Sequence, residues 1–304
     1  MGTPIIFWIL FNAFVLLMLV LDLGIFHRKT HEVSLKEALT WTFIWISLAL
    51  VFNAIIYFWR GRQQALEFFT GYLIEKALSV DNIFVFIMIF TYFQIPSKYH
   101  HKVLFWGILG ALVMRAVFIF AGVALIEKFH FTIYIFGALL IYTGFKMFNH
   151  NNTKIEPEKN PLIRLFKKFI PVTPHLQEDN FFVKLNGKRF TTPLFLVLIL
   201  IETSDLIFAV DSIPAILAIT QDQFIVYTSN VFAILGLRSL YFALAGVVHR
   251  FWLLSLGLAV VLIFVGIKML LIDLFKIPIE WSLIFIAFII TGSIFLSLKI
   301  QRTN

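Results

Sequence analysis

The stretch 194-LFLVLILIETSDLIFAVDSIPAILAIT-220 is apolar over most of its length but contains three carboxylates, Glu202, Asp205 and Asp211. As a helix it would be about 40 Å long, enough to cross the hydrocarbon core of a bilayer. A carboxylate at mid-bilayer costs about 2.5–3.5 kcal/mol, so three unpartnered ones cost about 8–10 kcal/mol. Pro214 predicts that the helix does not continue unbroken. Acids beside a helix break at this depth indicate a cation site.

The composition is that of a membrane protein. Of the 304 residues, 60% are hydrophobic and 14% are charged, whereas soluble domains carry about 25% charged residues. We therefore expect one transmembrane domain over residues 1–304, in contact with the lipid bilayer. The chain has no cysteine, which excludes disulfides and thiolate metal sites. The net charge of +8 does not indicate nucleic-acid binding, because the basic residues collect in loops on one side.

The fold class predicted is an all-α polytopic membrane protein with about nine transmembrane helices. The first apolar run is too long for a signal-peptide core and lacks a basic segment before it, so it is expected to remain as a span. The nine predicted spans are residues 4–26, 39–59, 66–93, 103–126, 131–148, 193–219, 225–248, 252–272 and 279–298.

The loops predict the orientation. Sixteen lysines and arginines fall in segments on one side of these spans, and four fall on the other side: Arg60, Arg62, Lys128 and Lys276. The positive-inside bias places the N-terminus outside and the C-terminus in the cytoplasm, in a bacterial-type plasma (inner) membrane. An odd number of spans likewise requires the two termini to lie on opposite sides of the membrane.

The longest polar segment is the predicted cytoplasmic loop 149–192. Its four prolines exclude one long helix. Residues 181–185 and 188–192 flank Asn186-Gly187 and predict a short β-hairpin with a type I′ turn. We interpret the loop as a connector, with a regulatory role as the alternative.

Spans three to five resemble spans six to eight. Residues 81–84 (DNIF) parallel residues 205–208 (DLIF), and residues 144–147 (GFKM) parallel residues 266–269 (GIKM). The repeat predicts a first copy at about 66–148 and a second at about 193–272.

Each copy contains three spans, so the second enters the membrane from the opposite face. This is a 3+3 inverted-topology repeat, an architecture of secondary transporters that places the site at mid-membrane between the copies.

Five carboxylates lie at similar depth in the third and sixth spans: Glu75, Asp81, Glu202, Asp205 and Asp211. Glu75 and Asp81 have the same six-residue spacing as Asp205 and Asp211, which leaves a second repeat register open. On a regular helix Glu75 and Asp81 would lie about 120° apart. They would converge only across a wide cavity or on an unwound helix.

The same depth offers three bases: Lys76, Arg115 and Arg238. Complete pairing still leaves about two carboxylates, which must be protonated or must hold a cation. We expect the two arginines to neutralise acids when no metal is bound. Asn82 and Ser212 would serve as neutral supporting groups beside the acids.

The donor types restrict the cation. All eight histidines fall in loops or at span ends, so the predicted core offers oxygen ligands. Such ligands suit Mn²⁺, Mg²⁺ or Ca²⁺ rather than Zn²⁺ or Cu⁺. Asp22, a turn from the cytoplasmic end of the first span, either joins the site or reaches the interface. No Walker motif, nucleophile elbow or dinucleotide fingerprint occurs, and no organic cofactor is expected.

Residues 71–82 (GYLIEKALSVDN), 207–216 (IFAVDSIPAI) and 230–238 (NVFAILGLR) resemble the signature stretches of the TerC family of integral membrane proteins, and the whole chain is similar to its Alx-type members. The resemblance implies a link to tellurium resistance, to pH-responsive expression, to manganese export, or to the role named membrane-bound redox modulator.

The function predicted is a secondary transporter, not an enzyme, that exports a divalent metal cation in exchange for protons, with Mn²⁺ favoured. The alternative is a non-transporting membrane partner in a stress-resistance or redox complex, acting through the 149–192 loop. A membrane oxidoreductase is a third possibility and would need a cofactor. The sequence identifies no protein partner.

Overall fold

The structure is a computed structural model, and it describes residues 3–21, 33–148, 171–185, 187–245, 251–275 and 277–300. Over these residues the chain forms helices and one small hairpin. The helices are α1 (Ile5–Leu21), α2 (Leu35–Arg60), α3 (Arg62–Tyr92), α4 (Ser97–Lys128), α5 (Thr132–Phe148), α7 (Pro193–Leu217), α8 (Gln223–Leu235), α9 (Leu237–Leu244), α10 (Trp252–Leu270) and α11 (Ile279–Lys299).

The structure confirms a mostly helical chain with membrane-spanning helices. Within the described residues, six helical stretches are long and apolar enough to cross a bilayer: α2, α4, α7, the α8–α9 stretch, α10 and α11. α3 is 31 residues long but carries five charged side chains, and α1 and α5 are apolar helices of 17 residues. The number of nine spans and the inverted repeat stay predictions.

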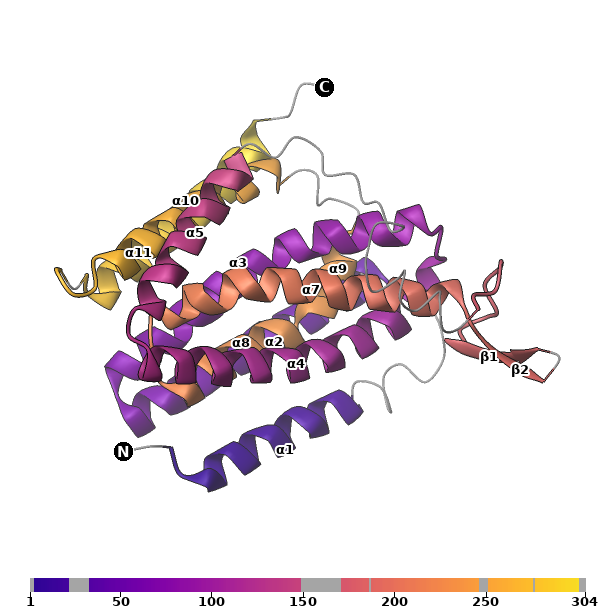
Figure 1. Ribbon diagram of the computed structural model, residues 1–304, viewed down its shortest axis with the longest axis horizontal. Helices are drawn as coiled ribbons and strands as arrows, with labels where there is room; N and C mark the ends of the chain where they lie inside the picture. Colours follow the sequence, from indigo (N-terminus) through magenta and orange to yellow (C-terminus); the bar gives the residue numbers. More distant parts are fainter. Residues whose placement is uncertain are drawn as a thin grey trace.

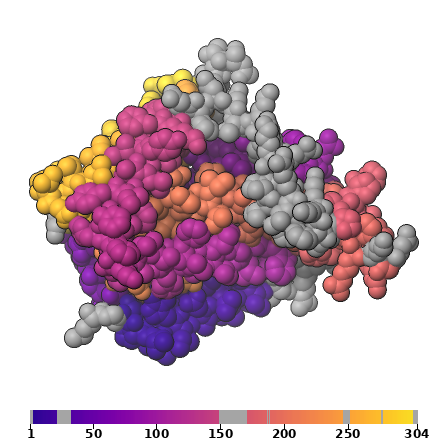
Figure 2. Space-filling view, in the orientation of Figure 1, coloured from indigo at the N-terminus to yellow at the C-terminus, as the bar shows by residue number. Residues whose placement is uncertain are grey.

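The helices form two groups (Figure 1). α2, α3, α4, α7 and α8 run side by side, while α5, α10 and α11 make a separate, tilted group at one end. α8 lies inside the first group and packs against α2, α3 and α4. α1 covers the outside of α4 (Figure 2), where Trp8 meets Phe120.

Large apolar side chains face outward, and charged side chains lie inside. Phe58 is 85% exposed and Phe288 is 73% exposed, while Glu75 and Arg115 are 1% and 2% exposed. Most of the interior is apolar as well. The exposed apolar side chains fit a lipid surround, because acyl chains accept apolar side chains at no cost. Charged side chains are costly inside a membrane domain, so the buried Glu75 and Arg115 mark a candidate functional site.

α7 does not break where the sequence predicts. The helix continues through all three carboxylates and ends at Leu217, so Pro214 lies in its last turn. A proline there removes one hydrogen bond, to the carbonyl of Val210, and little helix remains beyond it to be redirected. The expectation of an interrupted helix at this position was wrong.

The interruption occurs instead in the predicted span 225–248, which divides at Gly236 into α8 and α9. The ammonium group of Lys76 reaches this point and donates to the carbonyl of Ala233 at 3.3 Å. In a continuous helix that carbonyl would accept from the amide of Leu237. A side chain inserted into the backbone hydrogen-bond ladder is a known cause of helix breaks. Lys76 therefore replaces the backbone amide as the donor to this carbonyl.

α5 and α10 pack closely through their glycines. A Cβ on Gly266 would lie 2.7 Å from the carbonyl oxygen of Gly137, and a Cβ on Gly144 would lie 2.8 Å from the carbonyl oxygen of Ala259. The offset that carries Gly144 to Gly266 also carries Gly137 to Ala259. The two contacts are therefore exchanged by one two-fold operation, the pattern that an inverted repeat would produce.

The predicted hairpin is confirmed by two antiparallel strands, β1 (Phe182–Leu185) and β2 (Lys188–Thr191), paired from Leu185 opposite Lys188 outward. Gly187 has φ of +78°, as the turn requires. The hairpin projects beyond the helices at the end opposite α11 (Figure 1). Residues 149–170 of the same loop lie outside the described part of the chain.

We expect Gly266→Ala to destabilise the protein by about 1–3 kcal/mol, because the added methyl group collides with a backbone carbonyl that cannot move independently. The matched control is Gly292→Ala on α11, where an added Cβ meets nothing within 4 Å. Alanine favours helix, so the control should be neutral or slightly stabilising. Thermal unfolding of the two purified variants in detergent measures the difference. Equal melting temperatures would contradict the close α5–α10 contact.

Candidate metal-ion site

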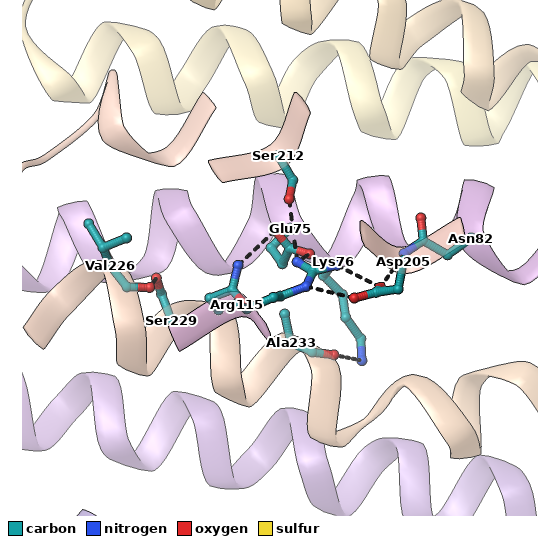
Figure 3. A network of polar contacts seen from close by, with 10 residues as sticks. Glu75, Lys76, Asn82, Arg115, Asp205, Ser212, Val226, Ser229 and Ala233 are labelled. Atoms are coloured by element: carbon teal, nitrogen blue, oxygen red, sulfur yellow. Dashed lines mark hydrogen bonds and ion pairs between the residues drawn. The ribbon is translucent and has the colours of Figure 1, made fainter. Parts of the chain in front are cut away.

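Arg115 of α4 is buried between acids of two other helices (Figure 3). Its Nη1 donates to Glu75 of α3, and its Nη2 and Nε donate to Asp205 of α7 at 2.9 and 3.2 Å. All three residues are at most 3% exposed. The forked guanidinium matches the two carboxylates in geometry. One cation is therefore shared by two acids.

Two asparagines complete the hydrogen bonding of these acids. Asn82 of α3 donates to Asp205 at 3.1 Å, and Asn230 of α8 donates to Glu75 at 3.0 Å. The amide oxygens of both asparagines are buried and have no hydrogen-bond partner among the described residues. Buried oxygens normally have partners. These two are free acceptors beside a pair of acids.

Ser212 of α7 is the sixth member of what we call the central cluster: Glu75, Asn82, Arg115, Asp205, Asn230 and Ser212. Arg115 Nη1 donates to the Ser212 hydroxyl at 3.3 Å as well as to Glu75, so the guanidinium links the serine to that acid. Through Arg115, Glu75 is thus linked to the serine after Asp211, while Asp205 accepts from the asparagine after Asp81. This exchange favours the register that pairs Glu75 with Asp205.

Asp81 and Asp211 do not join the central cluster. Asp81 accepts from Ser255 of α10 at 2.8 Å, and Asp211 accepts from Thr143 of α5 at 2.9 Å. α3 is continuous here, so the angle between Glu75 and Asp81 expected for a regular helix is retained. The two acids connect the two helix groups in matching ways, each through one hydroxyl.

Glu202 lies one turn before Asp205 on α7. Its carboxylate occupies the space beside Gly110 of α4, where an added Cβ would lie 2.0 Å from Oε1. Its Oε2 is buried and has no hydrogen-bond partner within the described chain. Glycine at position 110 therefore gives this acid its room.

The predicted bases have separate roles. Lys76 caps the end of α8 and does not pair with an acid in the described structure. Arg238 of α9 lies 3.0 Å from His101 Nε2 and lines a small cavity, about 10 Å³, together with Asp205.

The structure therefore does not gather the five carboxylates into one compact set. Within the described ranges, no three acids or histidines lie close enough together to hold one metal ion. The reason is helical geometry, since acids six residues apart on an unbroken helix face different neighbours. Asp22 lies outside the described residues.

Asn230 is the member of the central cluster that sequence reasoning did not assign to the site. It is an amide near the start of the predicted span 225–248, and it is fully buried. Such a residue in a membrane helix forms an interhelical hydrogen bond. Its partner, Glu75, could not be read from the sequence because the two residues are 155 positions apart.

The comparisons with known proteins identify the family. The model of the family "Integral membrane protein TerC family" matches residues 60–304, which include the central cluster. The chain belongs to the TerC family. No solved structure matches it.

Relatives of this TerC protein align over nearly their whole length. An "Uncharacterized membrane protein STKORF319" of Myxococcus xanthus is 55% identical over 97% of this chain and 92% of the relative. A protein of Escherichia coli (strain K12) described as "Putative membrane-bound redox modulator Alx" is 48% identical over 93% of this chain and 90% of the relative. These descriptions name no catalysed reaction.

We expect Asn230→Leu to lower the stability of this TerC protein by about 1–3 kcal/mol, because one oxygen of the buried Glu75 carboxylate loses its donor. The matched control is Asn53→Leu, a half-buried asparagine of α2 whose amide oxygen has no hydrogen-bond partner in the described structure. It should change stability less. Thermal unfolding in detergent compares the two, and an equal loss would contradict the role given to Asn230.

Proposed function

We propose that this TerC protein is a secondary transporter that exports a divalent metal cation, with Mn²⁺ favoured, in exchange for protons. The observation that supports it is a set of carboxylates inside the helix bundle, of which two share one base and others contact hydroxyls. Glu75 and Asp205 share the single guanidinium of Arg115. Asp81 accepts a hydrogen bond from a hydroxyl, and one oxygen of Glu202 has no hydrogen-bond partner among the described residues. Charge in a low-dielectric interior must be balanced, and a metal ion or protons can do so.

The chemistry of the donors supports a hard cation. The central cluster contains two carboxylates, two amide groups and a hydroxyl, and the chain has no cysteine. Oxygen donors of this kind suit Mn²⁺, and they also suit Mg²⁺ and Ca²⁺. The metal here is the substrate, so its residence must be temporary. A set of neutral and charged oxygens held by three separate helices is compatible with release.

The two helix groups supply a means of alternating access. Acids of α3 and α7 reach hydroxyls of α10 and α5, so each group contacts the other through a proton- or cation-sensitive hydrogen bond. In the proposed orientation the N-terminus is outside and the C-terminus is in the cytoplasm of a bacterial cell. Rocking of one group against the other would open the central cluster to one side at a time.

Proteoliposomes loaded with Mn²⁺ and subjected to a pH gradient test the proposal, with metal release followed by a Mn²⁺-sensitive dye. Wild-type protein should release Mn²⁺ faster when protons can enter in exchange. Asp205→Asn and Glu75→Gln should reduce the rate by about tenfold or more, because loss of one charged ligand exceeds about 1.4 kcal/mol.

The matched control is Glu280→Gln, an acid at the start of α11 that pairs with Arg62 at a partly exposed position. It should transport like the wild type. Wild-type vesicles that are no faster than empty vesicles would contradict the proposal. So would an Asp205→Asn variant with an unchanged rate.

The name given to the Alx relatives favours the second candidate, a membrane partner that modulates redox reactions of other proteins. Without cysteine, this chain would act only through a partner, and loop 149–192 is its longest polar segment. That function predicts that deleting the loop abolishes resistance of cells to Mn²⁺ or oxidant stress while Asp205→Asn preserves it. Transport predicts that Asp205→Asn abolishes resistance to Mn²⁺.

A further inference from the structure

We propose that Arg115 is a tethered cation, which occupies the Glu75–Asp205 pair when no substrate is bound and moves toward Glu202 when a divalent cation enters. This inference rests on the proposed function and adds an intramolecular competitor to it. The inference gives this role to Arg115 and not to Arg238, whose guanidinium contacts His101.

The guanidinium and a metal ion cannot use the pair of acids together. Arg115 engages both carboxylates, and Asp205 uses both of its oxygens for Nη2 and Nε. The remaining Glu75 oxygen accepts from Asn230. A divalent ion at the same carboxylates would therefore displace the guanidinium, because two cations in a dry interior repel each other strongly.

The unpartnered amide oxygens indicate that the site serves another ion as well. With the guanidinium present, Asn82 and Asn230 turn their NH₂ groups to the carboxylates, and their buried oxygens have no partner in the described structure. Rotation of each amide about its last side-chain bond exchanges nitrogen for oxygen. Two carboxylates, two amide oxygens and the Ser212 hydroxyl would then face a metal ion, a donor set typical of hard cations.

The structure also offers a place for the displaced guanidinium. Side chains on a helix lean toward its N-terminus, so Arg115 leans toward Ala111. Ala111 and Asp205 line the small cavity. Glu202 lies one turn before Asp205, on the same face of α7, with a buried oxygen that has no hydrogen-bond partner among the described residues. A shift of one turn along α4 would carry the guanidinium from Asp205 to Glu202.

Binding of Mn²⁺ to purified full-length protein in detergent, at constant pH, tests the inference. Arg115→Gln should bind Mn²⁺ about tenfold tighter than wild type or more, because removing a competitor raises the fraction of binding-competent sites. Without metal, Arg115→Gln should have a lower melting temperature than wild type. Addition of Mn²⁺ should raise the melting temperature of Arg115→Gln by more than it raises that of wild type. The matched control Arg60→Gln breaks the ion pair with Asp222 instead, and its Mn²⁺ affinity should equal that of wild type.

A double-mutant cycle with Glu202→Gln tests the second position. If Glu202 receives the guanidinium, Glu202→Gln weakens Mn²⁺ binding in wild type and has no effect in Arg115→Gln. If Glu202 is itself a ligand, it weakens binding in both backgrounds, and the proposed movement is overturned.

If Arg115→Gln does not fold, Arg115→Lys replaces it, since an ammonium keeps the charge but loses the forked contact and should bind Mn²⁺ more tightly than wild type. If wild type binds Mn²⁺ and the Arg115 variant binds it equally or more weakly, the tethered-cation proposal is overturned. The transport proposal is then left intact. Wild type that neither binds nor transports Mn²⁺ overturns both.

Discussion

The structure depends on one buried interaction, the guanidinium of Arg115 between the carboxylates of Glu75 and Asp205. It joins α3, α4 and α7 at a point where all three residues are at most 3% exposed. Removing charges from water is costly, and their mutual attraction repays that cost only when the geometry and the remaining hydrogen bonds are good. Asn82 and Asn230 supply those hydrogen bonds. Their placement follows from the ion pair.

A polar cluster inside a mostly apolar bundle also bears on how the helices associate. Lipid gives no driving force for burying leucine, so helices associate through close packing and polar contacts. The α5–α10 contact uses the first device, with Gly137 and Gly266 each against the other's backbone. The contacts of Asp81 and Asp211 use the second. The acids that the sequence predicts to form one metal site are thereby divided between the central cluster and the boundary between the two helix groups.

Helix continuity shows where local patterns mislead. Proline is a strong breaking signal, yet Pro214 falls where α7 ends within three residues. Gly236 is a weaker signal, but the break occurs there because Lys76 from another helix takes the carbonyl of Ala233. A residue's own propensity decides a helix end only when no distant side chain competes for the same backbone group. In a polytopic protein such competition comes from helices far apart in sequence.

The sequence by itself determined the membrane class, the apolar helical segments, the hairpin in the loop and the residue types of a candidate cation site. Composition and short-range periodicity carry that information, since a carboxylate in an apolar run is unfavourable whatever surrounds it. Only the tertiary structure decided which acids meet. Partners such as Glu75 and Asn230 lie on separate helices, and the contact between them depends on how those helices rotate and pack. The local sequence does not determine how the helices rotate against one another. The sharing of one guanidinium by two acids is therefore visible only in the folded chain.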